Sequence, residues 1–131
     1  MAEWQPWALR LIDVIRSADP DAVVFVSGIN WGYDLRGMPL NRPNLVYSTH
    51  VYRNKDLSWA EAFGNLATRV PVFAAEWGGQ EVDQEWGRLL ADYFDQLGMG
   101  WTAWSWSNEP FLVDGYVSTQ FGELVRTRLA G

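Results

Sequence analysis

The sequence has no cysteine and a single histidine, His50, in 131 residues. Without cysteine the chain forms no disulfide and offers no thiolate for zinc binding or nucleophilic catalysis. With one imidazole, a histidine-rich metal site within one chain is not expected. No apolar run reaches the ~18 residues that a membrane-spanning helix needs. The start of the chain, Met1 to Arg10, lacks the basic and apolar regions of a signal peptide. The cellular location therefore stays open.

Positive charge is also scarce, with 10 Lys and Arg against 16 Asp and Glu, which gives a net charge of −6. A chain this acidic is not expected to have nucleic acid or an anionic membrane as its partner. Aromatic side chains are abundant by contrast, with nine Trp and five Tyr. The hydrophobic fraction of 48% is typical of a globular domain, and the length fits one domain, residues 1–131.

Hydrophobic periodicity predicts four strands, each short and apolar, alternating with amphipathic helices. We expect strands at residues 22–26, 45–51, 70–75 and 99–106, the first of them buried on both faces. We expect helices at 4–18, 58–69, 82–97 and 121–129, with Ser58 and Glu61 as a capping box. Such alternation predicts an α/β fold with a parallel sheet and right-handed crossovers.

Two α/β architectures compete, an open doubly wound sheet and part of a (β/α)8 barrel. A barrel of ~250 residues uses ~31 residues per strand–helix unit, so this chain holds about four units. The open sheet would bind its ligand at one switch point, and the sequence has no glycine-rich phosphate loop. We therefore expect a (β/α)4 half of a TIM barrel.

Polar or aromatic residues follow all four predicted strands, which favours a barrel because barrel active sites lie at the C-terminal ends of strands. Glu76 is the foremost candidate, because a carboxylate closing an apolar strand must be functional, paired or exposed. His50 and Tyr52 are two residues apart, so both side chains point the same way and could hydrogen-bond a carboxylate or a substrate hydroxyl. A solvated Glu and a satisfied, half-buried His are the alternatives.

The tryptophans divide by position along the predicted elements. Trp7, Trp59 and Trp86 lie on helix stripes and are expected in the core. Four others follow strands or lie in loops, where an aromatic face suits the apolar face of a sugar ring; packing is the alternative for each. These four are Trp31, Trp77, Trp104 and Trp106.

Four segments together resemble glycoside hydrolase family 5, the cellulase-type barrel of clan A. They are VSGINWGYDL (26–35), NLVYSTHVY (44–52), PVFAAEWG (71–78) and GWTAWSW (100–106), followed by TQFGELV (119–125). The resemblance covers nearly the whole chain and corresponds to strands five to eight of that barrel. It implies a retaining enzyme for β-1,4-glucans or mannans that uses no cofactor, from a family that is commonly secreted.

The resemblance also implies roles for single residues. Glu76 matches the nucleophile, and His50 and Tyr52 match the pair that orients it and contacts substrate. Trp104 matches a sugar platform, with Trp106 as the alternative. In the loop after the fifth strand, the family has residues that line outer subsites. Their counterparts in this sequence are Asn30, Trp31 and Tyr33.

The acid/base of the family, in an Asn-Glu-Pro segment after the fourth strand, has no counterpart at the matching place. Asn108-Glu109-Pro110 copies its letters but follows the last strand, and Glu81 is a second nearby carboxylate. Neither is expected to take part in the chemistry.

Half a barrel has two open sheet edges and an uncovered inner face, which favour association. We expect a homodimer or higher oligomer in which a second copy closes the barrel. Three functions stay open: a weakly active or inactive glycosidase half, a non-catalytic carbohydrate-binding module, and a structural half-barrel.

Overall fold

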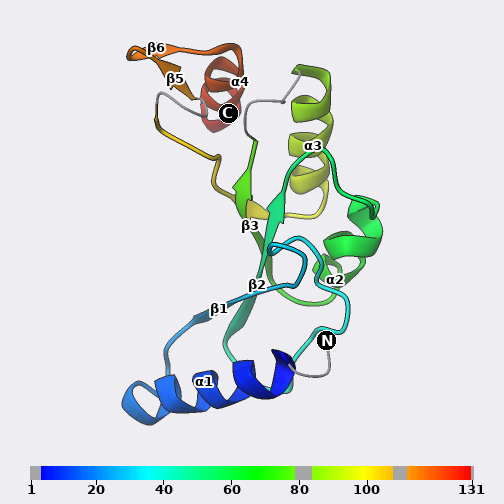
Figure 1. Ribbon diagram of the computed structural model, residues 1–131, viewed down its shortest axis with the longest axis vertical. Coiled ribbons are helices and arrows are strands. Elements are labelled where there is room, and N and C mark those ends of the chain that lie inside the picture. Colours follow the sequence, from blue (N-terminus) through cyan, green and yellow to red (C-terminus); the bar gives the residue numbers. More distant parts are fainter. Residues whose placement is uncertain (1–3, 79–83, 108–111, 131) are drawn as a thin grey trace. The chain divides into compact units, whose positions relative to one another are not determined.

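The computed structural model describes residues 4–78, 84–107 and 112–130. Its helices are α1 (Trp4–Ala18), the π-helical turn η1 (Ala60–Gly64), α2 (Asn65–Ala67), α3 (Gln84–Gln96) and α4 (Gln120–Leu129). Its strands are β1 (Val24–Ser27), β2 (Leu45–Val51), β3 (Val72–Trp77), β4 (Gly100–Trp101), β5 (Val113–Asp114) and β6 (Val117–Ser118) (Figure 1). None of the helices in these three ranges is long and apolar enough to cross a membrane.

Strands β1 to β4 form one sheet in the order β1-β2-β3-β4, and β5 pairs with β6 in a separate antiparallel hairpin. β1 and β2 are parallel, with Val24 opposite Leu45 and Ser27 opposite Ser48. Parallel neighbours need a long connection between them, which the segment between these two strands supplies. The predicted α/β class with a parallel sheet is confirmed.

The chain divides into two compact units. The first contains the residues up to Thr49 together with Leu57–Phe73, and the second contains His50–Asp56 and the chain from Ala74 onward. The first therefore holds α1, β1, η1 and α2, and the second holds α3, β4, the β5–β6 hairpin and α4.

In the first unit, apolar side chains from α1, β1, β2 and η1 are buried. Phe63 of η1 packs edge-on against Tyr33, with ring centroids 6.2 Å apart. The predicted capping box is present: the Glu61 N–H donates to Ser58 Oγ, and the Ser58 N–H donates to Glu61 Oε2, both at 3.3 Å. Because of this cap the helix starts at the expected place, although its residues Ala60–Gly64 are π-helical.

The first strand is less buried than the sequence predicts. Phe25 of β1 is 56% exposed and Val23 before it is 62% exposed, because β1 is the end strand of the sheet and has one neighbour. On α1, Ile12 is buried but Trp7 is 63% exposed, so the expectation of a core role for Trp7 is wrong. Periodicity identified an apolar stripe, but only part of that stripe is covered.

In the second unit the core is built around Trp77, which is fully buried. Its ring meets those of Phe94, Trp101 and Phe121 edge-on, with centroids 6.0, 5.4 and 5.2 Å away. The fourth strand is shorter than predicted, two residues instead of eight. After β4 the chain joins the sheet at an isolated bridge, Gly78 with Trp104, and Ser105 O accepts a hydrogen bond from the N–H of Leu112.

Candidate active site

The site is built around the carboxylate of Glu76, the fifth residue of β3. Tyr52 Oη donates a hydrogen bond of 3.0 Å to Glu76 Oε2, and His50 Nδ1 lies 3.7 Å from Glu76 Oε1. The Glu76 and His50 side chains are 29% and 25% exposed. All three residues belong to the second unit. The structure thus brings together three residues that stand up to 26 positions apart in the sequence.

Neighbouring strands explain this convergence. His50 lies on β2 and Tyr52 directly follows it, so the two side chains are one full pleat repeat apart. The chain leaves β3 at Gly78, whose N–H donates to Val51 O, the residue between His50 and Tyr52. This backbone contact fixes Glu76 at the level of the pair on β2.

Electrostatics keep the Tyr52 phenol protonated. Burial raises the pKa of Tyr52 above its ordinary value, and the hydrogen bond to Glu76 and the negative charge of that carboxylate raise it further. At neutral pH the phenol is therefore a hydrogen-bond donor and Glu76 Oε2 is its acceptor. A donor of this kind holds one carboxylate oxygen and leaves the other, Oε1, facing His50.

Trp104 and Trp106 follow β4 with exposed rings. Trp104 is 46% exposed, its N–H donates to Trp77 O at 2.9 Å, and its peptide bond to Ser105 is cis. Trp106 is 75% exposed. Trp77 differs from both because its ring is buried, so its indole is part of the core and presents no face at the surface.

The loop after β1 carries the remaining candidates, and it belongs to the first unit. Asn30 and Trp31 have positive φ angles of 55° and 59°, and Gly32 follows at 81°. The loop closes on itself through paired hydrogen bonds between Ile29 and Asp34, and Trp31 at its tip is 88% exposed. The loop residues that match outer subsites in the resemblance therefore lie in a tight turn that presents one indole.

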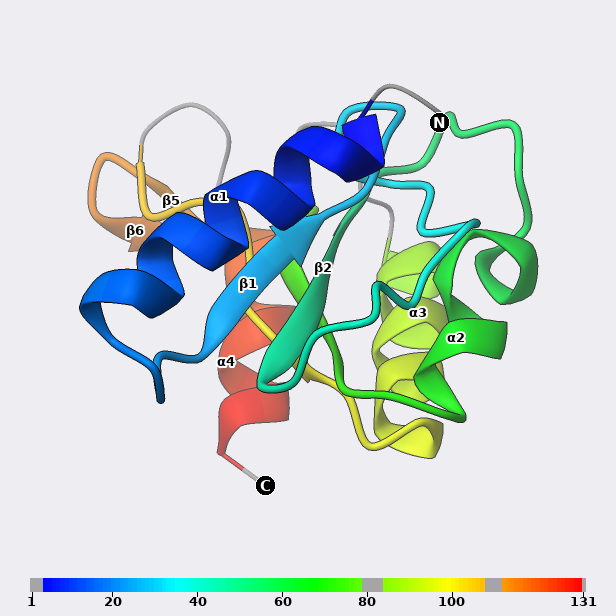
Figure 2. The same cartoon turned by 90° about the horizontal axis from the view of Figure 1, so that it is seen from below.

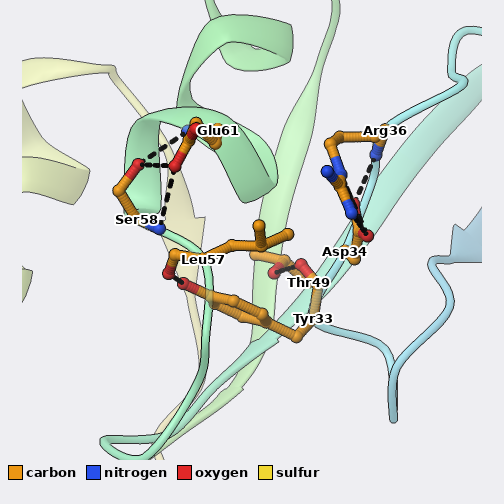
Figure 3. Close-up of polar contacts among 7 residues, drawn as sticks. All are labelled: Tyr33, Asp34, Arg36, Thr49, Leu57, Ser58 and Glu61. Atoms are coloured by element: carbon orange, nitrogen blue, oxygen red, sulfur yellow. Dashed lines mark hydrogen bonds and ion pairs between the residues drawn. The ribbon is translucent and has the colours of Figure 1, made fainter.

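Buried contacts anchor this turn (Figure 3). Tyr33 Oη donates to Leu57 O at 2.6 Å, and Thr49 Oγ1 donates to Tyr33 O at 3.0 Å. Asp34, 3% exposed, receives two hydrogen bonds from the Arg36 guanidinium at its Oδ2 and the Arg36 N–H at its Oδ1. Tyr33 is thus buried and hydrogen-bonded, so its ring supports the loop and is not an exposed sugar-binding surface. Sequence reasoning missed the Asp34–Arg36 pair, whose only signal was opposite charge two residues apart.

The other carboxylates considered from the sequence, Glu81 and Glu109 with its neighbours Asn108 and Pro110, lie outside the described residues. Within residues 4–78, 84–107 and 112–130, no group of three or more His, Asp or Glu side chains has the arrangement of a metal site.

A parallel β/α sheet with polar side chains at adjacent strand ends is typical of a segment of a (β/α)8 barrel. The model of cellulase, glycosyl hydrolase family 5, matches residues 1–110, and the chain belongs to this family. The endoglucanase CelA of Streptomyces lividans is 30% identical over 95% of this chain and 34% of its own length. The endoglucanase MaCel5A of Microbulbifer sp. is 29% identical over 80% of this chain and 24% of its own length.

Solved structures agree on the fold. The β-glucanase SdGluc5_26A of Saccharophagus degradans superimposes with a TM-score of 0.87 at 24% identity, over 98% of this chain and 47% of that protein. Endoglucanase Cel5A of Thermobifida fusca, in complex with cellotetraose, gives 0.77 at 22% identity, over 97% and 52%. The chain thus spans about a third or less of the curated relatives above and about half of these solved structures. The predicted partial TIM barrel is confirmed.

Proposed function

We propose that the chain is the nucleophile-bearing half of a β-1,4-glucan hydrolase and that Glu76 is the nucleophile. The observation that carries this proposal is the placement of Tyr52 and His50 against the two oxygens of Glu76. The names of the related proteins support it, since the curated relatives are endoglucanases and one solved neighbour holds cellotetraose. The substrate class is therefore a β-linked oligo- or polysaccharide.

In the proposed first step, Glu76 Oε1 forms a bond to the anomeric carbon of the sugar while the bond to the leaving oxygen breaks. Tyr52 holds Oε2, so the attacking oxygen keeps a fixed direction. In the second step water replaces the carboxylate and the configuration is retained. The first step converts the Glu76 carboxylate into a neutral ester and the second regenerates the carboxylate, and no cofactor takes part.

A retaining enzyme needs a second carboxyl about 5–5.5 Å from the first, to protonate the leaving oxygen and then activate water. We infer that Glu76 alone does not meet this requirement, because the family's acid/base segment after the fourth strand has no counterpart at the matching place in this sequence. The 131-residue chain by itself then hydrolyses unactivated glucan weakly or not at all.

Trp104 is the proposed sugar platform, with Trp106 as the alternative, because both present exposed indole rings in the unit that holds Glu76. Asn30 and Trp31 are proposed to line outer subsites, since the tight turn leaves the Trp31 side chain 88% exposed. An apolar indole face packs against the C–H face of a pyranose, while the sugar hydroxyls remain hydrogen-bonded at its edges.

The test uses a 2-fluorinated dinitrophenyl β-cellobioside, because its phenolate leaves without a proton and the missing acid/base is not needed. Mass spectrometry should find one glycosyl group covalently bound to Glu76 in the unmodified chain. Glu76→Gln should give no adduct, whereas Glu85→Gln, a change of an exposed carboxylate on α3 in the same unit, should react like the unmodified chain. Labelling of a different residue, or unchanged labelling of Glu76→Gln, would refute the proposal.

The exposed tryptophans also favour a second candidate, a non-catalytic carbohydrate-binding module. It predicts that cellotetraose binds and that Trp104→Ala loses this binding, while no covalent adduct forms in the mass spectrum. Absence of both binding and labelling would leave a structural half-barrel.

For the partner, we propose that the chain associates with a second copy of itself. The four-stranded sheet has two edges, and a fold of this kind closes only with further strands. Two copies supply about the length of chain that the solved neighbours contain.

A further inference from the structure

Strand β3 contains one residue more than the segment that pairs with it after β4. The N–H of Thr102 donates to Ala74 O at 2.9 Å, and the N–H of Trp104 donates to Trp77 O, also at 2.9 Å. In a regular parallel ladder the hydrogen bonds are evenly spaced, so both strands advance by the same number of residues. Here β3 advances three residues, from Ala74 to Trp77, while its partner advances two. The extra residue makes a β-bulge at the place of Glu76.

The burial of side chains along β3 shows the same irregularity. In a regular strand the side chains alternate between the two faces, so Glu76 would share a face with Ala74, and Trp77 would lie on the other face. Instead Ala74 and Trp77 are both fully buried, whereas the Glu76 side chain is 29% exposed. Trp77 lies on the face of β3 that packs against helices α3 and α4 (Figure 2), because its ring meets Phe94 of α3 and Phe121 of α4. The bulge therefore turns Glu76 away from these helices.

This change of face brings the carboxylate to its partners. Tyr52 Oη donates to Glu76 Oε2, and His50 Nδ1 lies 3.7 Å from Glu76 Oε1. Without the extra residue, alternation would direct Glu76 toward the apolar rings around Trp77, where an unpaired charge is costly. Bulges commonly occur next to active sites, where they change the direction of a side chain. The bulge thus determines on which side of β3 the carboxylate is presented.

The Thr102 side chain makes a hydrogen bond to the bulge itself. The extra residue of a bulge disrupts the ladder, so its backbone groups need partners from outside the regular pattern. Thr102 Oγ1 donates a hydrogen bond to Ala75 O, in addition to the bond from its N–H to Ala74 O. Ala75 O belongs to the peptide group that leads into Glu76. The hydroxyl therefore fixes the peptide plane next to the Cα atom from which the Glu76 side chain leaves.

We propose that Thr102 is a positioning residue for Glu76, whose hydroxyl stabilises the bulge and so keeps the carboxylate directed at Tyr52 and His50. The inference rests on the proposed function, because it concerns the residue proposed as the nucleophile. Thr102 acts through the backbone of β3, so it is not itself a catalytic residue. Its role requires a hydroxyl donor and not the threonine methyl group. Thr102→Ser should therefore preserve the role, and Thr102→Val, which keeps the shape but removes the donor, should abolish it.

The first measurement is the pKa of Tyr52, followed by NMR of labelled tyrosine Cζ atoms. Thr102→Val should lower this pKa toward its value in Glu76→Gln, because the carboxylate that raises it moves away. Thr102→Ser should restore the pKa of the unmodified chain. The matched control is Thr127→Val, at a threonine of α4 in the same unit whose Oγ1 also donates to a backbone oxygen, Glu123 O, at 2.8 Å. This variant should leave the pKa of Tyr52 unchanged.

The second measurement is the rate at which the 2-fluorinated dinitrophenyl β-cellobioside labels Glu76. At saturating reagent, Thr102→Val should slow labelling about tenfold or more, because a 1 Å displacement of a reacting group can cost ~10²-fold in rate. The reagent concentration that gives half the maximal rate should change little. Thr102→Ser and Thr127→Val should react at the rate of the unmodified chain. Circular dichroism should show every variant folded, and Thr102→Ala takes the place of Thr102→Val if the latter does not fold.

Three results would overturn the inference. They are an unchanged pKa of Tyr52 in Thr102→Val, equal effects in Thr102→Ser, and equal effects in Thr127→Val. Failure of the proposed function gives a different result: no variant is labelled at Glu76, but the pKa of Tyr52 still responds to Thr102→Val. Conversely, normal labelling of the unmodified chain with no effect of Thr102→Val would refute the role of Thr102 and leave the proposed function intact.

Discussion

The Tyr52 hydroxyl and the Glu76 carboxylate are joined by a 3.0 Å hydrogen bond, and the charge of the carboxylate helps to keep the phenol protonated. The phenol donates, so the contact is strongest when Glu76 is ionised and Tyr52 is protonated. Burial and the Glu76 charge both raise the pKa of Tyr52, and raising it preserves the donor.

The first prediction concerns this pair. Glu76→Gln should lower the pKa of Tyr52 from its raised value, because the negative charge that opposes tyrosinate formation is removed while burial remains. The check is an alkaline titration followed by NMR of labelled tyrosine Cζ atoms, with Tyr52→Phe identifying the signal. The pKa values of Tyr47 and Tyr93, which burial raises without contact to Glu76, should not move. A Tyr52 signal that titrates identically in Glu76→Gln would mean that the pair does not interact in solution.

The second prediction concerns Trp104 as a sugar platform. Trp104→Ala should weaken binding of cellotetraose about ten- to a hundredfold, because an aromatic contact surface worth ~1.5–3 kcal/mol is lost. Isothermal titration calorimetry measures this change. Tyr116→Ala provides the control, since Tyr116 is an aromatic residue of the same unit that is 89% exposed on the hairpin. Equal weakening in both variants would assign the effect to the fold and not to the Trp104 indole.

Local rules predicted the sheet and the shared direction of His50 and Tyr52, whereas the placement of Glu76 beside that pair was implied by the family resemblance. Alternation on β2 sets which side chains share a direction, and parallel strands bring their carboxyl ends to one edge of the sheet. Such rules need no knowledge of the partner elements.

The sequence could not show which apolar side chains are covered by other parts of the chain and which are exposed. The stripe on α1 has the same spacing whether or not a partner lies over it, so Trp7 was expected in the core and is exposed. The buried state of Tyr33 depends on Leu57, 24 residues away, and no local pattern encodes that contact. By contrast, the β5–β6 hairpin carried a usable signal in Gly115, the first residue of a two-residue turn in which Gly115 and Tyr116 both have positive φ.

The third prediction concerns the backbone directly after the site. Gly78 has a φ of +117°, and a Cβ there would meet Phe121 Cζ at 2.4 Å. Gly98 also has a positive φ, +63°, but a Cβ there would meet nothing within 4 Å. Gly98→Ala should therefore cost about 1 kcal/mol of unfolding free energy from backbone strain, and Gly78→Ala about 2–5 kcal/mol from strain plus overpacking. Urea denaturation measures both, and equal costs would show that Phe121 yields without penalty.

The last prediction uses the buried carboxylate of Asp34. Its burial tends to raise its pKa, but the hydrogen bonds and the charge of Arg36 outweigh this effect, so the pKa is lowered from the usual 3.8. A carboxyl whose pKa is lower in the folded chain contributes stability above its unfolded pKa and loses it as pH falls through the folded value. Asp34→Asn should therefore lower the free energy of unfolding by about 1–3 kcal/mol at neutral pH.

The pH dependence tests the cause of that loss. The difference between the unmodified chain and Asp34→Asn should shrink below about pH 4, where the unmodified carboxyl begins to take up protons as it unfolds. Glu123 offers a matched pair, because its pKa is also lowered by an arginine, Arg126, but its side chain is 48% exposed. Glu123→Gln should thus lower the free energy of unfolding at neutral pH much less than Asp34→Asn does, since exposed ion pairs contribute little. If Asp34→Asn lost the same stability at all pH values, the ion pair with Arg36 would not be its source, and packing of the loop beneath Trp31 would carry the effect instead.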